Sequence, residues 1–216
     1  DLIFKVLFPS ILTGGNIVTI ATLGALLSLL VAMFLTHGIS RLTASAYLGC
    51  VGAVIVTLVT AIIAVKATAL TGFATDESVF LNLATKGGLD FVALLIGGII
   101  IGVIGVIDDI TITQASVVQE LKSAGGHLTR SELYFRAMKV GKNHMGAVIN
   151  TLILAYTGAS LPLVLLLYVS ESPIVQLINS EVITTEIVRT IVGSLAFLSA
   201  VPLTTLISFF LMKKDD

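Results

Sequence analysis

The stretch GGIIIGVIGVIDDITITQAS, residues 97–116, decides the fold class. Its first part is apolar and rich in glycine, and residues 91–107 contain no charged residue and no histidine. A helix needs about 20 residues to cross a bilayer core of roughly 30 Å. This segment reaches that length only if it continues through Asp108 and Asp109 to about residue 113. The stretch therefore predicts a membrane-spanning helix with two carboxylates at membrane depth.

Four further stretches lack Asp, Glu, Lys, Arg and His, and each is longer than 20 residues: 6–36, 42–65, 145–170 and 190–212. We therefore expect five membrane spans, near residues 17–35, 44–65, 91–113, 147–169 and 191–212. Pro162 and Pro202 predict local bends in the last two. The predicted fold class is an all-α integral membrane protein, with residues 1–216 forming a single transmembrane domain, a five-span transmembrane helix bundle.

The composition agrees with lipid as the main solvent. Charged residues make up 12% of the 216 residues, about half the share found in soluble domains. The net charge of −1 gives no basic surplus of the kind that marks a nucleic-acid partner. The single cysteine, Cys50, excludes an internal disulfide and a CxxC motif, and we interpret it as a small buried hydrophobe. We find no motif for ATP, a metal or a redox cofactor, and expect no cofactor and no metal site.

Basic residues gather on one predicted side of the membrane. The loops at 36–43 and 114–146 and the C-terminal tail contain Arg41, Lys122, Arg130, Arg136, Lys139, Lys142, Lys213 and Lys214. The opposite side has Lys5, Lys66, Lys86 and Arg189. The positive-inside rule therefore predicts an N-terminus outside and a C-terminus in the cytoplasm. An odd number of spans without an initiator Met leads us to expect the C-terminal part of a longer chain.

A cytoplasmic amphipathic helix is expected between the third and fourth spans. Thr129 and Glu132 have the spacing of a capping box, and apolar residues alternate with basic ones over residues 130–142. Such a helix lies on the inner membrane surface, either as an orientation anchor or as a docking site for a cytoplasmic partner.

The glycines of the third span share a face with one of the acids. Gly98, Gly102, Gly105 and Asp109 recur at intervals of four, three and four residues, which favours close approach of another helix. We therefore expect Asp109 to face protein, with Thr113 on the same side, and Asp108 to point about 100° away.

Two adjacent carboxylates in a span suggest proton carriage. A carboxylate at the centre of a span costs about 2.5–3.5 kcal/mol, and two adjacent acids resist double ionisation. The other interpretation is a hydrated, inert pair at the cytoplasmic end of the span. In the fourth span, Asn150 and Thr151 are polar among apolar residues, and Asn150 is either a relay partner of Asp109 or a simple interhelical contact.

Two blocks carry a resemblance to a known family. The chain resembles the YibE/F family of bacterial membrane proteins over essentially its whole length. The two blocks are GVIGVIDDITITQASVVQEL at 102–121 and GKNHMGAVINTLILAYTGASLPL at 141–163. The layout is more distantly similar to the transmembrane half-domain of the resistance-nodulation-division superfamily and to SecD/SecF. That similarity implies a proton-carrying role for Asp108 and Asp109, faced by Asn150 and Thr151. Those pumps also use a Lys from a partner half, and no Lys or Arg lies inside a predicted span here.

These observations lead to two hypotheses of function. The first is a transporter or translocase in the bacterial plasma membrane, coupled to the proton motive force, with Asp108, Asp109, Asn150, Thr151 and Thr113 as the proton relay. Its partners would be the lipid bilayer, protons, and a homo-oligomer or a partner membrane subunit. The alternative is a non-transporting membrane scaffold or assembly factor. An intramembrane aspartyl protease needs acids on two facing spans, so we expect no enzyme.

Overall fold

The structure is a computed structural model that describes residues 8–12, 15–124, 129–170 and 173–212. Those residues form helices and connecting turns, without strands. The helices are α1 (Phe8–Leu12), α2 (Ile17–His37), α3 (Arg41–Ala67), α4 (Asp76–Ala84), α5 (Phe91–Ala124), α6 (Arg130–Ala159), α7 (Leu161–Val169), α8 (Ile174–Ile178) and α9 (Glu181–Leu211).

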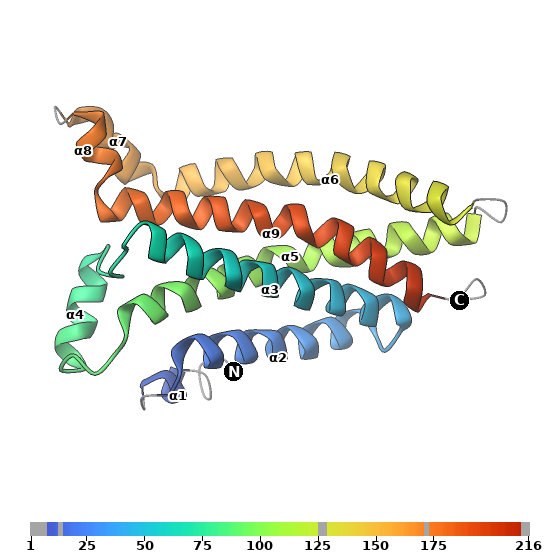
Figure 1. Cartoon of the computed structure of the whole chain (residues 1–216), viewed down its shortest axis with the longest axis horizontal. Coiled ribbons are helices and arrows are strands. Elements are labelled where there is room, and N and C mark those ends of the chain that lie inside the picture. The colour runs from blue at the N-terminus through green and yellow to red at the C-terminus, as the bar shows by residue number, and fades with distance from the viewer. Residues whose placement is uncertain (1–7, 13–14, 125–128, 171–172, 213–216) are drawn as a thin grey trace.

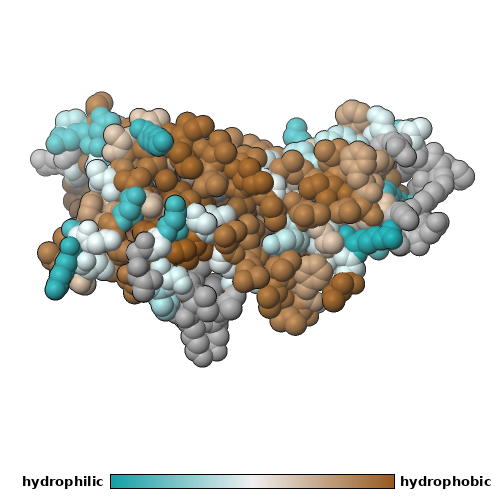
Figure 2. Space-filling view, turned by 60° about the horizontal axis from the view of Figure 1, so that its bottom comes forward, coloured by the Kyte–Doolittle hydropathy of each residue, from teal (hydrophilic) through white to brown (hydrophobic). Residues whose placement is uncertain are grey.

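The long helices lie side by side along the molecule (Figure 1). The α2–α3 turn and the end of α9 lie at one end, here called the α9-C end, and α1, α4, α7 and α8 lie at the other, the α4 end. Helix α3 packs most extensively against α9 and α5, and α5 also packs against α9 and α2. Figure 2 shows apolar side chains over the middle of the molecule and hydrophilic ones mostly toward its ends, as expected for helices that cross a membrane.

Side chains define where the helices begin. The Asn16 side chain accepts a hydrogen bond from the Thr19 N–H at 3.1 Å, and Ser40 accepts one from the Thr43 N–H at 3.1 Å. These bonds satisfy backbone donors that an N-terminal turn leaves unpaired. Between the two helices, Gly38 has φ +74°, a left-handed conformation that suits glycine after a helix end.

Small residues bring α3 and α9 together. Gly49 lies so close to Thr204 that an added Cβ would collide with the threonine side chain. One turn away, the Ser208 hydroxyl donates a hydrogen bond to Ser45 at 3.0 Å, and both residues are fully buried. Close backbone approach and interhelical hydrogen bonds are the interactions that hold helices together in lipid. Cys50, next to Gly49, is buried and reduced, as the sequence predicts.

A carboxylate ties the α3–α4 connection to α9. Glu181, the first residue of α9, accepts hydrogen bonds from the backbone N–H groups of Thr71 (2.9 Å), Gly72 (2.8 Å) and Phe73 (3.2 Å). The Phe73 ring stacks on Phe91 at the start of α5, with centroids 4.4 Å apart. These contacts hold the starts of α5 and α9 beside the end of α3.

Four of the five predicted spans are single helices long and apolar enough to cross a membrane: α2, α3, α5 and α9. The span expected at 147–169 is divided between α6 and α7, which meet at an angle of 67° close to Pro162. By length and composition, the described residues therefore contain four candidate spans, or up to five if this bent pair crosses as one. Pro162 marks a bend as predicted. Pro202 lies inside α9, which continues past it to Leu211, and the bend expected there stays a prediction.

The predicted amphipathic helix is present as the first part of α6. The Thr129 N–H donates to Glu132 Oε2 at 2.9 Å and the Glu132 N–H donates to Thr129 Oγ1 at 3.3 Å, which confirms the capping box. The helix continues without a break to Ala159, so it is not separate from the fourth span. Leu133 and Ala137 are buried, whereas Arg136 is exposed.

Candidate functional site

The acid pair lies near the middle of α5, a helix of 34 residues. Asp108 is partly buried, and its Oδ1 is buried and has no hydrogen-bond partner. Asp109 is exposed. This reverses the expectation that Asp109 faces protein, because the arc of α5 that packs on the neighbouring helices contains Ile107, Ile110 and Thr111.

Asp108 lies within electrostatic range of groups on two other helices. It interacts electrostatically with His37, at the end of α2, and with Cys50 on α3. Its backbone carbonyl accepts a hydrogen bond from the Thr111 hydroxyl at 3.0 Å. The carboxylate thus has one buried oxygen that no donor reaches among the described residues. Buried polar atoms without a partner are uncommon in folded proteins and need an explanation.

The glycine face of α5 does not pack within this chain. Gly98, Gly102 and Gly105 are exposed, and an added Cβ at each would have no atom within 4 Å. The close approach to α2 uses Gly97 instead, where an added Cβ would lie 3.1 Å from the Cβ of Ala21. No described helix of this chain covers the face of the three glycines, which lies open beside Asp109, so the expected close approach of another helix stays a prediction.

Among the described residues, Asn150 and Thr151 of α6 make no hydrogen bond to the acid pair. Asn150 and Thr151 are exposed, and the Thr151 hydroxyl donates to the Ala147 carbonyl of its own helix at 3.2 Å. Ile149, partly buried beside Asn150, lines a hollow of about 190 Å³ between α5, α6 and α9, as does the exposed Thr157. The predicted facing of Asn150 toward Asp109 is therefore not seen. Thr113 is partly buried on α5.

A basic residue lies inside α9, contrary to expectation. Arg189 lines the same hollow as Thr157, and its Nε is buried without a hydrogen-bond partner. One guanidinium nitrogen lies 3.7 Å from Glu186. The sequence placed this residue before the last span, but α9 begins at Glu181 and already contains it.

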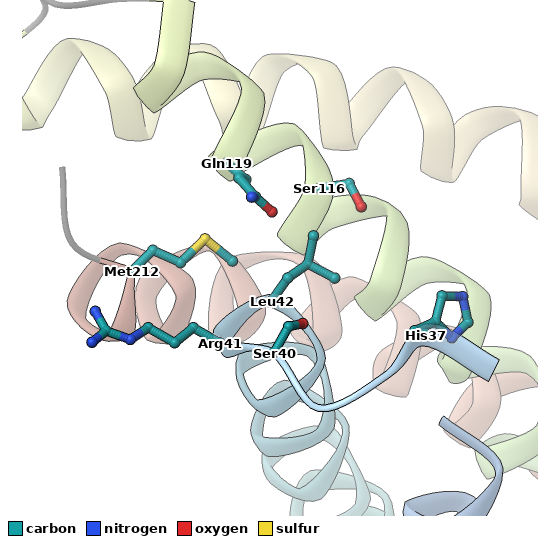
Figure 3. A pocket seen from close by; sticks show the side chains of 7 residues that line it. All are labelled: His37, Ser40, Arg41, Leu42, Ser116, Gln119 and Met212. Atoms are coloured by element: carbon teal, nitrogen blue, oxygen red, sulfur yellow. The ribbon is translucent and has the colours of Figure 1, made fainter. Parts of the chain in front are cut away.

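A second hollow, of about 440 Å³, opens at the α9-C end (Figure 3). His37, Ser40, Arg41 and Leu42 line it from the α2–α3 turn, Ser116 and Gln119 from α5, and Met212 from the end of α9. Gln119 is eleven residues beyond Asp108, so the two lie on nearly the same face of α5, about 16 Å apart along the axis. The hollow therefore lies on nearly the same face of α5 as Asp108, although Asp108 does not line it.

Sequence reasoning missed the polar link at the centre of the bundle. Gln114, 2% exposed, donates hydrogen bonds from Nε2 to the Ala137 carbonyl at 3.1 Å and to Thr205 Oγ1 at 2.7 Å. It therefore joins α5 to both α6 and α9. Gln114 lies one residue beyond the predicted end of the third span and beside Thr113 and Ser116, so it did not stand out from an apolar run as Asn150 did.

No group of three or more His, Cys, Asp or Glu side chains placed to hold a metal occurs among the described residues. A family model described as YibE/F-like protein matches residues 2–214. The chain belongs to the YibE/F-like family. No curated protein and no solved structure matches it.

Membership of the YibE/F-like family agrees with the resemblance in the sequence, and with four apolar helices it indicates a membrane protein. The more distant similarity to the resistance-nodulation-division superfamily and to SecD/SecF stays a prediction.

Proposed function

We propose that this YibE/F-like chain is a transporter or translocase driven by the proton motive force, with Asp108 as its proton carrier. The observation that carries the proposal is the buried Oδ1 of Asp108, which has no hydrogen-bond partner. An ionised carboxylate in that position is expensive, and uptake of a proton removes the charge. Release of the proton requires water or a base, which the α9-C hollow would provide through His37.

The proposal uses fewer residues than the sequence suggested. Asp109 is exposed beside the uncovered glycine face, so it would adjust the charge of the pair rather than hold the buried proton. Asn150 and Thr151 lie away from the pair, and their part in a relay would require another conformation. Protonation of Asp108 would remove the negative charge of its carboxylate, and would thereby change how α5 packs against α2 and α3.

Proton flux into vesicles tests this function. The purified chain is reconstituted in vesicles with a trapped pH-sensitive dye, and a potassium diffusion potential drives protons inward. We expect acidification with the unchanged chain and its loss with Asp108→Asn. Glu120→Gln is the matched control, because Glu120 is an exposed acid on the same helix. Flux in Asp108→Asn equal to that of the unchanged chain would refute the proposal.

A second candidate function is a membrane scaffold that does not transport. The uncovered face of Gly98, Gly102 and Gly105 favours it, because such a face suits close contact with a helix of another subunit. A scaffold would keep its partners in the Asp108→Asn variant, whereas a transporter would keep its assembly and lose flux. No enzymatic activity is part of either proposal.

A further inference from the structure

Two adjoining hollows lie at the α4 end of the molecule. One, the apolar hollow, has a volume of about 430 Å³ and is lined by α1, α2, α4 and α5, including Ile17, Leu81, Leu94, Gly98 and Ile101. The other, the mixed hollow, has a volume of about 780 Å³ and lies between α2, α3 and α5. Ile11, Ile17 and Leu89 line both, so the hollows adjoin each other at the first turn of α2. Both volumes are in the range of small-molecule sites.

The apolar hollow matches a hydrocarbon chain. All ten of its lining residues are apolar or glycine. Gly98 faces open space there, because a Cβ added to it would meet no atom within 4 Å. In the membrane this space must be filled, and the surrounding solvent is lipid. Helix α4, which covers one side, exposes Phe80 and Leu83 to 70% and 69%, as suits a helix lying in the membrane interface.

The mixed hollow adds polar groups of both signs. Lys66, in the last turn of α3, and Asp90, just before α5, line it together with Asn16. Asp90 Oδ1 accepts a hydrogen bond from the Ala93 N–H at 3.0 Å, which fixes the carboxylate at this site. An ammonium and a carboxylate in one hollow complement a headgroup that has a phosphate and an amine.

We propose that the two hollows together bind one zwitterionic phospholipid. An acyl chain fills the apolar hollow against Gly98, the phosphate lies at Lys66, and the headgroup amine lies at Asp90. Chain burial alone gives little preference in a membrane, because the bilayer is as apolar as the hollow. The selectivity therefore comes from the headgroup, and Asp90 disfavours a purely anionic lipid. The proposal does not depend on proton coupling.

Native mass spectrometry of the purified chain tests the apolar hollow, with phosphatidylethanolamine added in detergent. Gly98→Leu fills the hollow, and Gly105→Leu is the matched control, an equally open glycine outside it. We expect the unchanged chain and Gly105→Leu to retain one lipid with similar affinity, and Gly98→Leu to bind about tenfold more weakly. Equal retention by all three, or equal loss in both variants, would overturn the proposal.

The charged groups are tested with two lipids, phosphatidylethanolamine and phosphatidylglycerol. Lys66→Gln should weaken binding of both, whereas Lys86→Gln, an exposed lysine outside both hollows, should not. Asp90→Asn keeps a side-chain oxygen for the Ala93 N–H and should remove the preference for phosphatidylethanolamine. An unchanged chain that retains both lipids equally, or a Lys66→Gln chain that binds as Lys86→Gln does, would contradict the headgroup assignment.

Discussion

At the scale of single residues, the buried polar groups of the apolar helices are the most informative. Burying such a group costs free energy unless it forms a hydrogen bond. Gln114 and Asp108 lie on the same helix, but Gln114 has partners on α6 and α9 whereas Asp108 Oδ1 has none. Satisfied polar groups specify packing, and unsatisfied ones require a change of state or a missing partner. This contrast supports a structural role for Gln114 and makes Asp108 the candidate for a chemical role.

The role of Gln114 gives a stability prediction. Gln114→Ala removes two interhelical hydrogen bonds, and such bonds contribute about 0.6 kcal/mol on average in membrane proteins and at most about 1.7 kcal/mol. We expect a decrease of about 1–2 kcal/mol in the free energy of unfolding, measured by denaturant titration in mixed micelles. Gln119→Ala, on the same helix at the edge of the α9-C hollow, should change it by less than about 0.5 kcal/mol. Equal effects would contradict the assignment.

At the scale of elements, the sequence predicted the existence of the spans better than their ends or their faces. Long stretches without charge identified α2, α3, α5 and α9, because only apolar helices satisfy their backbone in lipid. The apolar run of a span ends at the membrane surface, but the helix continues beyond it. Helix α5 therefore extends to Ala124, and α9 starts at Glu181. This is why Arg189 was placed outside a helix.

The faces were harder to predict, because lipid-facing and core-facing residues are both apolar. Gly98 and Gly97 are neighbours about 100° apart on α5, and only the structure shows that Gly97 contacts α2. The same uncertainty of one residue affects two other predictions. Asp108, and not Asp109, is the partly buried acid, and Ile149, and not Asn150, lines the hollow between α5, α6 and α9. The acid pair itself was predictable, because two carboxylates stand out in an apolar run whichever way the helix is rotated about its axis.

The contact between α3 and α9 gives a second stability prediction. Gly49→Ala should decrease the free energy of unfolding by about 1–3 kcal/mol, the usual cost of overpacking, because the new methyl group collides with Thr204. Gly105→Ala is the control: its methyl group meets open space and its helix propensity improves by up to about 1 kcal/mol. The same denaturant titration measures both. A neutral Gly49→Ala would show that α3 and α9 do not touch at this point.

At the scale of the whole molecule, the two ends differ in the residues that line their hollows. The α9-C end has the hollow lined by His37 and Arg41, and Lys122 donates hydrogen bonds to the Phe209 and Met212 carbonyls there. The α4 end has the two hollows proposed for a lipid. We propose that the α9-C end is cytoplasmic, in the plasma membrane, because the predicted basic side coincides with it.

Cysteine labelling checks this orientation. Cys50 is the sole cysteine of the chain, so Cys50→Ser gives a background without thiols. In that background Ala84→Cys, exposed on α4, should react with a membrane-impermeant maleimide added to intact cells. Ser123→Cys, exposed at the end of α5, should react only after permeabilisation. The reverse pattern would place the α4 end inside.

The most direct test of the proposed role of Asp108 is infrared titration of the carboxyl groups of the purified chain in bilayers. A protonated carboxylic acid absorbs apart from a carboxylate, so the state of Asp108 is visible without a known substrate. We predict a carboxylic acid band that persists near neutral pH, is absent in Asp108→Asn and remains in Asp109→Asn. A spectrum in which both acids are ionised near neutral pH, as in water, or a band that Asp108→Asn leaves intact, would contradict the role of Asp108 as proton carrier.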